Sequence, residues 1–226
     1  MNLNNSSSSS SSKKEWSDSQ HVLNYLSAAN KIPNRKEGEA ILIDLVSSST
    51  LTTSSVKRIL DIGTGDGRLI KLIKDSIPDI EEVIGLDISP LMIKAVEHNF
   101  SNDSSVRIVE HDLEKSLPDL GYFDAVVSSF AIHHLKHQRK YFLYEEIYDI
   151  LYPGGIFCNL EHVSSPSIFH HNKFLKALDT SSKKEDKTNR LLSMEKQLQW
   201  LRDLGFVEVD CYWKWLELAL LVGYKL

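Results

Sequence analysis

Three glycines stand at alternate positions in the first half of the chain, Gly63, Gly65 and Gly67, and Asp61 lies two residues before the first of them. They follow an apolar run typical of a buried parallel strand and precede leucines and isoleucines at helical spacing. Glycine adopts backbone angles that other residues avoid, and it lets a ligand approach the main chain closely. The first turn of a helix also offers unpaired N–H groups. This order predicts a nucleotide-binding turn, with a glycine-rich turn that binds nothing as the alternative.

A second acidic residue, Asp87, ends the apolar run at residues 83–86, twenty positions after Gly67. An acid at the end of the second strand can accept hydrogen bonds from both hydroxyls of a ribose. Ser89 and Pro90 follow, and this pair is typical of a helix start. The two acids and the glycines between them therefore predict a site for an adenosine-type cofactor.

The elements that would position these residues alternate along the chain. Apolar runs predict further strands at residues 106–109, 123–129, 156–160, 206–212 and 216–224. Helices are expected from about residue 67, from residue 90, over 141–151 and over 193–204, with a turn at 153–155. Only residues 213–215 separate the last two strands, too few for a crossover, so these strands must pair antiparallel. The sequence predicts an α/β fold with a doubly wound, mostly parallel sheet.

Residues 61–67 read D-x-G-x-G-x-G, and with Asp87 they resemble the class I S-adenosylmethionine (SAM)-dependent methyltransferases. The resemblance covers about residues 56–225 and includes the acidic motif at 111–113. It implies a seven-stranded Rossmann-like sheet with an antiparallel last strand, and SAM as the cofactor. Dinucleotide-binding turns usually read G-x-G-x-x-G, so the glycine spacing disfavours an NAD-dependent oxidoreductase.

The resemblance also implies which residues contact the cofactor. The set is Asp61, Gly63, Thr64, Gly65 and Gly67 at the methionine portion and ribose, Asp87 at the ribose hydroxyls, Ile88, Met92, Asp112 and Leu113 at the adenine, and Ser128 and Ser129 beside the methyl group. Each type has a structural alternative. The acids can cap helices or turns, the methionine can belong to the core, and the serines can simply end a strand.

Residues that would face the methyl acceptor follow the fourth and fifth strands, because ligands bind at the carboxyl ends of parallel strands. His134 and Glu161 are the catalytic candidates, since imidazole takes up a proton near neutral pH. A base is needed only when the acceptor arrives protonated with a high pKa. The candidate substrate contacts are Tyr25, Arg35, His133, His162, Trp213 and Trp215. The alternatives are a loop cap for the histidines, a solvated charge for the arginine and ordinary packing for the aromatic residues.

Composition changes along the chain divide it into three parts. Residues 1–15, with seven consecutive serines, are expected to be a disordered tail, because they are too polar to form a core. Residues 16–55 are expected to form an N-terminal helical cap and a polar linker, and residues 56–226 the methyltransferase-like domain. Residues 168–192 look inserted after the fifth strand, as either a lid over the substrate or a loop without a chemical role.

Bulk properties limit the partners. The 226 residues are 42% hydrophobic and 25% charged, as in an ordinary globular protein. A net charge of −5 gives no overall attraction to nucleic acid or an anionic membrane, and no apolar run has the length of a membrane span. Cys158 and Cys211 are expected to be free thiols of a cytoplasmic protein. The nine histidines lack the spacing of a metal site, so no metal is expected.

The expected function is transfer of a methyl group from SAM to a small-molecule acceptor by in-line attack. The first alternative is a tRNA enzyme that modifies wobble uridine with SAM or a SAM derivative, against which stand the acidic balance and the lack of a recognisable RNA-binding module. The second is a non-catalytic SAM-binding module that regulates a partner. The sequence identifies neither the acceptor nor the oligomeric state.

Overall fold

The computed structural model describes residues 18, 20, 22, 31–48 and 56–226. The predicted tail at 1–15 and the candidate Tyr25 lie outside these residues, as does most of the predicted cap before residue 31. The described part of the cap contains the helix α3 (Arg35–Ser47), which follows a turn at 31–34.

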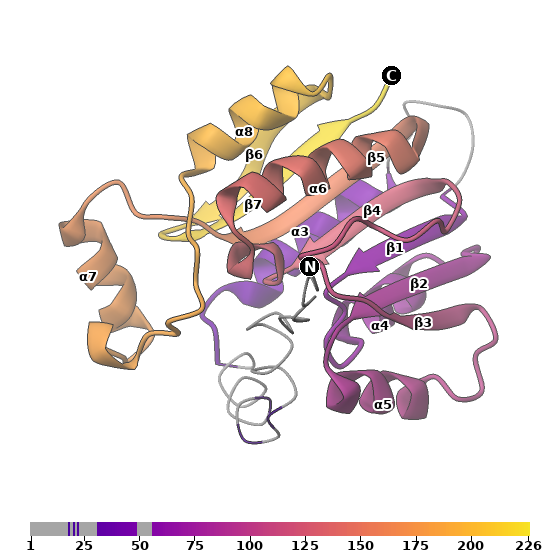
Figure 1. Ribbon diagram of the computed structural model, residues 1–226, viewed down its shortest axis with the longest axis horizontal. Helices are drawn as coiled ribbons and strands as arrows, with labels where there is room; N and C mark the ends of the chain where they lie inside the picture. Colours follow the sequence, from indigo (N-terminus) through magenta and orange to yellow (C-terminus); the bar gives the residue numbers. More distant parts are fainter. Residues whose placement is uncertain (1–17, 19, 21, 23–30, 49–55) are drawn as a thin grey trace, which may run out of the picture.

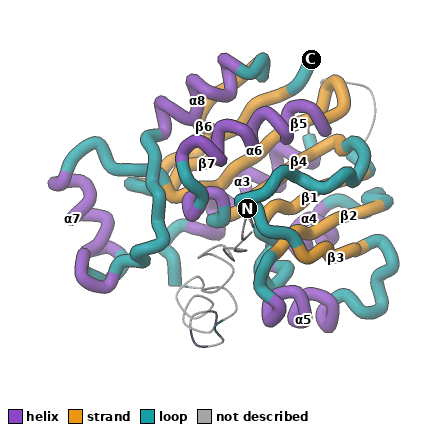
Figure 2. The backbone as a smooth tube through the Cα atoms, viewed as in Figure 1, coloured by secondary structure: helices purple, strands orange, loops and turns teal. Residues whose placement is uncertain are grey.

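A seven-stranded sheet forms the centre of the molecule, in the order β3-β2-β1-β4-β5-β7-β6 (Figures 1 and 2). The strands are β1 (Arg58–Ile62), β2 (Glu82–Asp87), β3 (Val106–Glu110), β4 (Phe123–Ser129), β5 (Leu151–His162), β6 (Val207–Trp215) and β7 (Leu218–Tyr224). The first five pair in parallel, whereas β7 is antiparallel to both β5 and β6. The predicted fold class, including the antiparallel last strand, is confirmed.

Helices cover both faces of the sheet, and each face has its own apolar core. The helices are α4 (Arg68–Ser76), α5 (Pro90–Asn99), α6 (His137–Ile150), α7 (Ile168–Ala177) and α8 (Met194–Asp203), with short 3-10 turns η1 (Ile132–His134) and η2 (Ser182–Lys184). Apolar side chains of α3, α4 and α5 pack on one face, and those of α6 and α8 pack on the other. Among the described residues, no helix combines the length and apolar character needed to cross a membrane.

Three boundaries predicted from the sequence were wrong. The predicted turn at 153–155 lies inside β5, where Gly154 has a φ of +86° and the pairing with β4 shifts register between Phe123 and Ala125. Residues 213–215, expected to join the last two strands, belong to β6, because Trp213 and Trp215 pair with β7; residues 216–217 make the turn instead. Helix α6 starts at His137, four residues before the predicted start at 141.

The expected alternation of strand and helix is interrupted between β3 and β4. Residues 111–122 contain no helix, and three leucines of this segment, Leu113, Leu117 and Leu120, pack against the core on the α6 face. A loop therefore covers the part of the sheet that a crossover helix would otherwise cover, and it runs from the carboxyl end of β3 to Leu120, whose carbonyl accepts from Arg58 at the start of β1.

Leu60 is fully buried in β1 at the middle of the sheet, so we expect Leu60→Ala to lower the free energy of unfolding by about 2–5 kcal/mol through lost burial and the cavity left behind. Leu91→Ala is the matched control, because Leu91 is 39% exposed on α5, and its change should be about 0.5 kcal/mol or less. Denaturant unfolding of both variants measures the difference. Equal losses in the two variants would contradict the assignment of Leu60 to the core.

Candidate functional site

A cleft opens where β1, β2, β3 and β4 end, and it encloses about 620 Å³ of space, open solvent included. Its lining comes from the glycine turn after β1, the end of β2 and start of α5, the loop after β3, and η1 with its flanking residues. The lining residues are Gly63, Gly65, Asp87, Ile88, Met92, His111, Asp112, Leu113, Phe130, Ala131, His134 and Leu135.

The three glycines of the turn all have positive φ angles, but each is required for a different reason. A Cβ on Gly63 would lie 2.1 Å from the Cβ of Ala131, so this glycine lets the turn contact η1. A Cβ on Gly67 would meet Phe100 at 2.9 Å, so this one lets α4 pack on α5. A Cβ on Gly65 would have nothing within 4 Å, because this residue faces the cleft. Gly65 is thus the position where a ligand can reach the main chain.

Asp87 holds the glycine turn and the start of α5 together. Its Oδ2 accepts from the backbone N–H of Gly65 at 2.8 Å, and its Oδ1 accepts from that of Ser89 at 2.8 Å. Burial raises the pKa of Asp87, and these N–H groups oppose the rise. Ser89 precedes α5 as predicted, but its side chain makes no capping hydrogen bond to the helix. The Asp87 carboxylate instead fixes the backbone of Ser89, the residue before the helix.

Asp61 lies beneath the turn rather than in the cleft lining. It is 1% exposed, and its Oδ2 accepts from the hydroxyl of Thr64 at 2.7 Å. Burial raises the pKa of Asp61 to about 7; the Thr64 hydrogen bond works against the rise, and the charge of Asp87 adds to it. The acid therefore supports the turn from behind and is easily protonated for a carboxyl group.

The structure brings together seven of the twelve predicted cofactor contacts at the cleft surface or its lining. These are Gly63, Gly65, Asp87, Ile88, Met92, Asp112 and Leu113. Asp61, Thr64, Gly67, Ser128 and Ser129 lie outside the lining, and the Ser128 hydroxyl donates to the carbonyl of Ile62 at 2.8 Å.

Four lining residues were not among the predicted sites: His111, Phe130, Ala131 and Leu135. The signal that could have found His111, Phe130 and Ala131 is their position directly after β3 or β4, whereas Leu135 follows η1. Phe130 has a φ of +55°, which turns the chain sharply as it leaves β4.

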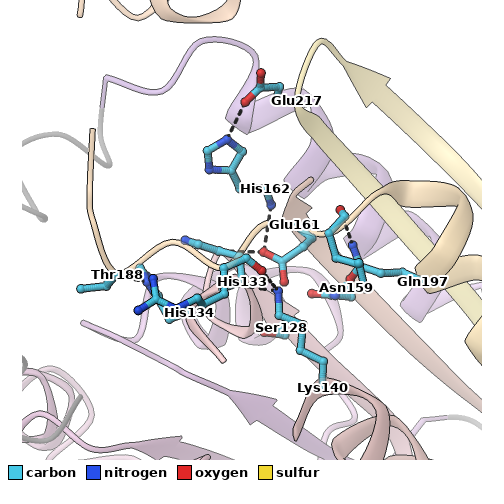
Figure 3. Close-up of polar contacts among 12 residues, drawn as sticks. Ser128, His133, His134, Lys140, Asn159, Glu161, His162, Thr188, Gln197 and Glu217 are labelled. Atoms are coloured by element: carbon cyan, nitrogen blue, oxygen red, sulfur yellow. Dashed lines mark hydrogen bonds and ion pairs between the residues drawn. The ribbon is translucent and has the colours of Figure 1, made fainter. Parts of the chain in front are cut away.

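Two adjacent histidines of η1 differ in their position relative to the cleft. His134 lines the cleft, and its Nδ1 lies 2.8 Å from the Thr188 hydroxyl. The ring of His133 lies 4.0 Å from that of His134 and is only 6% exposed, behind the cleft (Figure 3). Burial lowers the pKa of both imidazoles well below the ordinary value, so both are neutral near neutral pH.

Glu161, the second catalytic candidate, is fully buried behind His133. Its Oε1 accepts from the backbone N–H of His162 at 2.8 Å and lies 2.7 Å from His133 Nδ1 (Figure 3). Burial raises the pKa of Glu161, and the nearby charge of Lys140 opposes the rise. Glu161 therefore orients His133 and has no direct contact with the cleft lining described above.

The remaining substrate candidates contact other parts of the protein. His162 Nε2 lies 2.9 Å from Glu217 Oε2, and the ring of Trp215 packs edge-on against Phe174. Trp213 packs on α3 so closely that a Cβ added at Gly38 would lie 2.9 Å from its ring. Arg35 comes nearest to the cleft.

Arg35 reaches the edge of the cleft through its neighbours. Its Nε donates to Glu39 at 2.7 Å, and its guanidinium carbon lies 5.3 Å from the ring centroid of Phe130, a lining residue. Glu39 also accepts two hydrogen bonds from Arg68, directly after the glycine turn. The buried Glu39 carboxylate thus connects α3 to the turn.

Comparisons with known proteins agree with this arrangement. A family model described as a methyltransferase domain matches residues 59–155, which run from β1 into β5. A carboxy-S-adenosyl-L-methionine synthase of Helicobacter hepaticus is 23% identical, over 86% of this chain and 87% of its own length. A demethylmenaquinone methyltransferase of Thermus thermophilus is 36% identical over 49% of each chain, so this chain matches about half of that relative.

The fold is also found among solved structures. A TehB-like SAM-dependent methyltransferase from Corynebacterium glutamicum superposes with a TM-score of 0.61 at 19% identity, over 92% of this chain and all of the other. At that identity the likeness concerns the fold alone.

We expect the stability of the protein to depend on the ionisation of Asp61. Because the folded pKa of about 7 lies above the ordinary 3.8, the folded state holds a proton that the unfolded state has released, and the free energy of unfolding falls as pH rises from about 4 to about 7. Asp61→Asn removes this titration, so its stability relative to wild type should be greater at about pH 8 than at about pH 5. Denaturant unfolding at both pH values measures the change.

The control is Asp75→Asn, which removes an exposed carboxylate paired with Lys71. Its stability relative to wild type should be the same at the two pH values. A relative stability of Asp61→Asn that does not change with pH would contradict the raised pKa.

Proposed function

Because the chain is a class I SAM-dependent methyltransferase, we propose that it transfers the methyl group of SAM to a small-molecule acceptor at the cleft between the glycine turn and η1. The observation that carries this proposal is the joint position of Gly65 and Asp87. Gly65 leaves the main chain open to a ligand, and the carboxylate that holds it lies in the same cleft wall.

The cleft fits the two ends of an adenosine-type molecule. Each Asp87 oxygen accepts one backbone N–H and keeps a lone pair for a ribose hydroxyl. Ile88, Met92 and Leu113 supply apolar surface for an adenine ring, and Asp112 lies beside Leu113 to accept from the adenine amino group. The open space at Gly65 suits the portion of the molecule between the sugar and the amino acid.

When bound, SAM supplies a sulfonium-activated methyl group. The protein's part is to align the acceptor with that group and to exclude water. Ala131 and Phe130 close the wall where β4 ends, and His134 is the titratable group on the lining nearest to that wall. A neutral imidazole accepts a proton, so His134 suits an acceptor that must lose one; Asp61 and Thr64 act indirectly, by supporting the turn.

A second candidate function is favoured by the likeness to the carboxy-S-adenosyl-L-methionine synthase of H. hepaticus, which extends over most of both chains. In that case the enzyme would modify SAM itself with a carboxyl donor, and the methyl carbon would stay on the cofactor. The same cleft would bind the cofactor in both cases, so only the product distinguishes them.

The experiment is to incubate the protein with methyl-labelled SAM and fractionated metabolite and RNA extracts. Label in a small-molecule fraction, with S-adenosylhomocysteine formed in equal amount, is the expected result. Label retained on a SAM derivative that carries an added carboxyl group would establish the second function, and label in RNA would establish a nucleic-acid substrate. Binding of SAM without turnover in every fraction would refute catalysis of either kind.

We expect Gly65→Ala to weaken SAM binding by about tenfold or more while the fold is retained, because the added methyl meets no protein atom and projects into the cleft. Gly121→Ala is the matched control: Gly121 also has a positive φ, +78°, but is not part of the cleft lining. It introduces the same kind of backbone strain, so its SAM affinity should equal that of wild type. Calorimetric titration measures both, and equal affinities would place the cofactor elsewhere.

A further inference from the structure

Residues 164–192, here called the strap, leave the body of the protein after β5 and return to it before α8. The two ends meet, because the backbone N–H of Ser164 donates to the carbonyl of Leu192 at 3.0 Å. The strap contains α7 and η2, and Figure 1 shows α7 beyond the end of the sheet toward which β1 points. The ring of Phe174 on α7 packs against His162 of β5 and Trp215 of β6. Between these joined ends, the position of the strap depends on the contacts that its residues make with the rest of the protein.

The returning half of the strap contacts the wall of the cleft directly. The hydroxyl of Thr188 lies 2.8 Å from His134 Nδ1, and the backbone N–H of Arg190 donates to the carbonyl of His133 at 2.9 Å. The buried ammonium of Lys140 on α6 donates to the carbonyls of Arg190, at 2.6 Å, and His133, at 3.3 Å. The position of the strap therefore decides how His134 is presented to the acceptor.

The outgoing half is held by apolar contacts of α7, whose Phe174 is 2% exposed in the core, and by one buried carboxylate. Glu217, in the turn between β6 and β7, is 1% exposed, and its Oε1 lies 2.9 Å from Nδ1 of His171 on α7. The hydroxyl of Ser165, at the start of the strap, donates to the same oxygen. Its other oxygen, Oε2, lies 2.9 Å from His162 Nε2 on β5 (Figure 3). Glu217 thus joins the strap to the sheet at two points.

We propose that Glu217 is a positioning residue that latches the strap against the acceptor side of the cleft, so that the strap opens and closes as a unit when the acceptor enters. The inference rests on the proposed function for its purpose, since the acceptor is what the strap would enclose. It does not depend on the cofactor assignment, because Glu217 lies outside the cleft lining.

The charges around the latch make it dependent on pH. Burial opposes ionisation of Glu217, but the hydrogen bonds from His162, Ser165 and His171 outweigh it and hold the pKa of Glu217 below the ordinary value. Burial likewise opposes protonation of His171, whereas Glu217, and Glu185 at 3.3 Å, raise its pKa. Lys214 bonds the carbonyl of Leu216 in the same turn.

Because the pKa of His171 is raised, its ion pair with Glu217 is fully formed below the ordinary histidine pKa. The ion pair is lost as pH rises through the raised pKa. The latch is therefore expected to loosen at a pH above the ordinary histidine value of 6.5.

The test is hydrogen–deuterium exchange of the full chain. In Glu217→Gln, the amides of α7 should exchange about tenfold faster than in wild type, because a charge-assisted contact to the body is lost. Amides of β4 should keep their wild-type rates. After correction for the intrinsic rate, wild-type α7 should lose protection as pH rises above the ordinary histidine value of 6.5, and Glu217→Gln should show little of this dependence.

Glu185→Gln is the matched control. It removes a carboxylate from the same histidine, but Glu185 belongs to the strap itself and does not tie it to the sheet, so α7 exchange should stay within about twofold of wild type. Unchanged α7 exchange in Glu217→Gln, or an equal acceleration in α7 and β4, would overturn the proposal.

Titration with SAM separates failure of the latch from failure of the proposed function. Glu217→Gln is expected to bind SAM with wild-type affinity. Lack of SAM binding by the wild-type protein would count against the proposed function and leave the latch intact.

Discussion

The cleft depends on one hydrogen bond, in which the backbone N–H of Gly65 donates to the Asp87 carboxylate at 2.8 Å. It connects the end of β2 to the turn after β1, and the second oxygen of the same side chain fixes the start of α5 through Ser89. Parallel pairing of β1 with β2 brings the two strand ends to the same edge, and the backbone of the turn is further fixed because Gly63 and Thr64 donate to the carbonyl of Leu86. The ligand-facing backbone is therefore held rigid before any ligand arrives, which lowers the entropy lost on binding.

The parts of the fold that were predicted correctly depend on local sequence. The apolar runs of β1, β2 and β4 have no alternative to burial on both faces, and the positive φ angles at Gly63, Gly65 and Gly67 require glycine at the turn. The boundaries that were wrong depend on partners distant in sequence. Trp213 and Trp215 continue β6 only because β7 pairs with them, and residues 153–155 join β5 only because a register shift against β4 absorbs them.

The contacts of the site likewise divide into local ones, which the sequence predicted, and distant ones, which it did not. Contacts within one motif, such as Thr64 to Asp61 or Asp87 to Ser89, span three residues or fewer, so type and spacing predicted their neighbourhood. Contacts that distinguish His134 from His133 come from residues far along the chain, Thr188 for one and Glu161 for the other. No local pattern in H-H indicates which ring faces the cleft. Glu217 was predicted only as a strand residue, and its role depends on His162 and His171, 55 and 46 positions away.

Burial shifts the pKa values of the titratable groups around the site in the direction of their neutral forms. The pKa values of Asp61, Asp87 and Glu161 are raised by burial, and those of His133, His134 and Lys140 are lowered by it. Acids whose pKa is raised by burial respond to the charge that arrives. A cation near Asp61 or Asp87 favours their ionised forms, whereas an anion does not. SAM brings a sulfonium and an ammonium group, and Asp61 and Asp87 both bond residues of the glycine turn, whereas His134 lines the cleft from η1. The arrangement thus favours positive charge at the turn and separates these acids from the imidazole of His134.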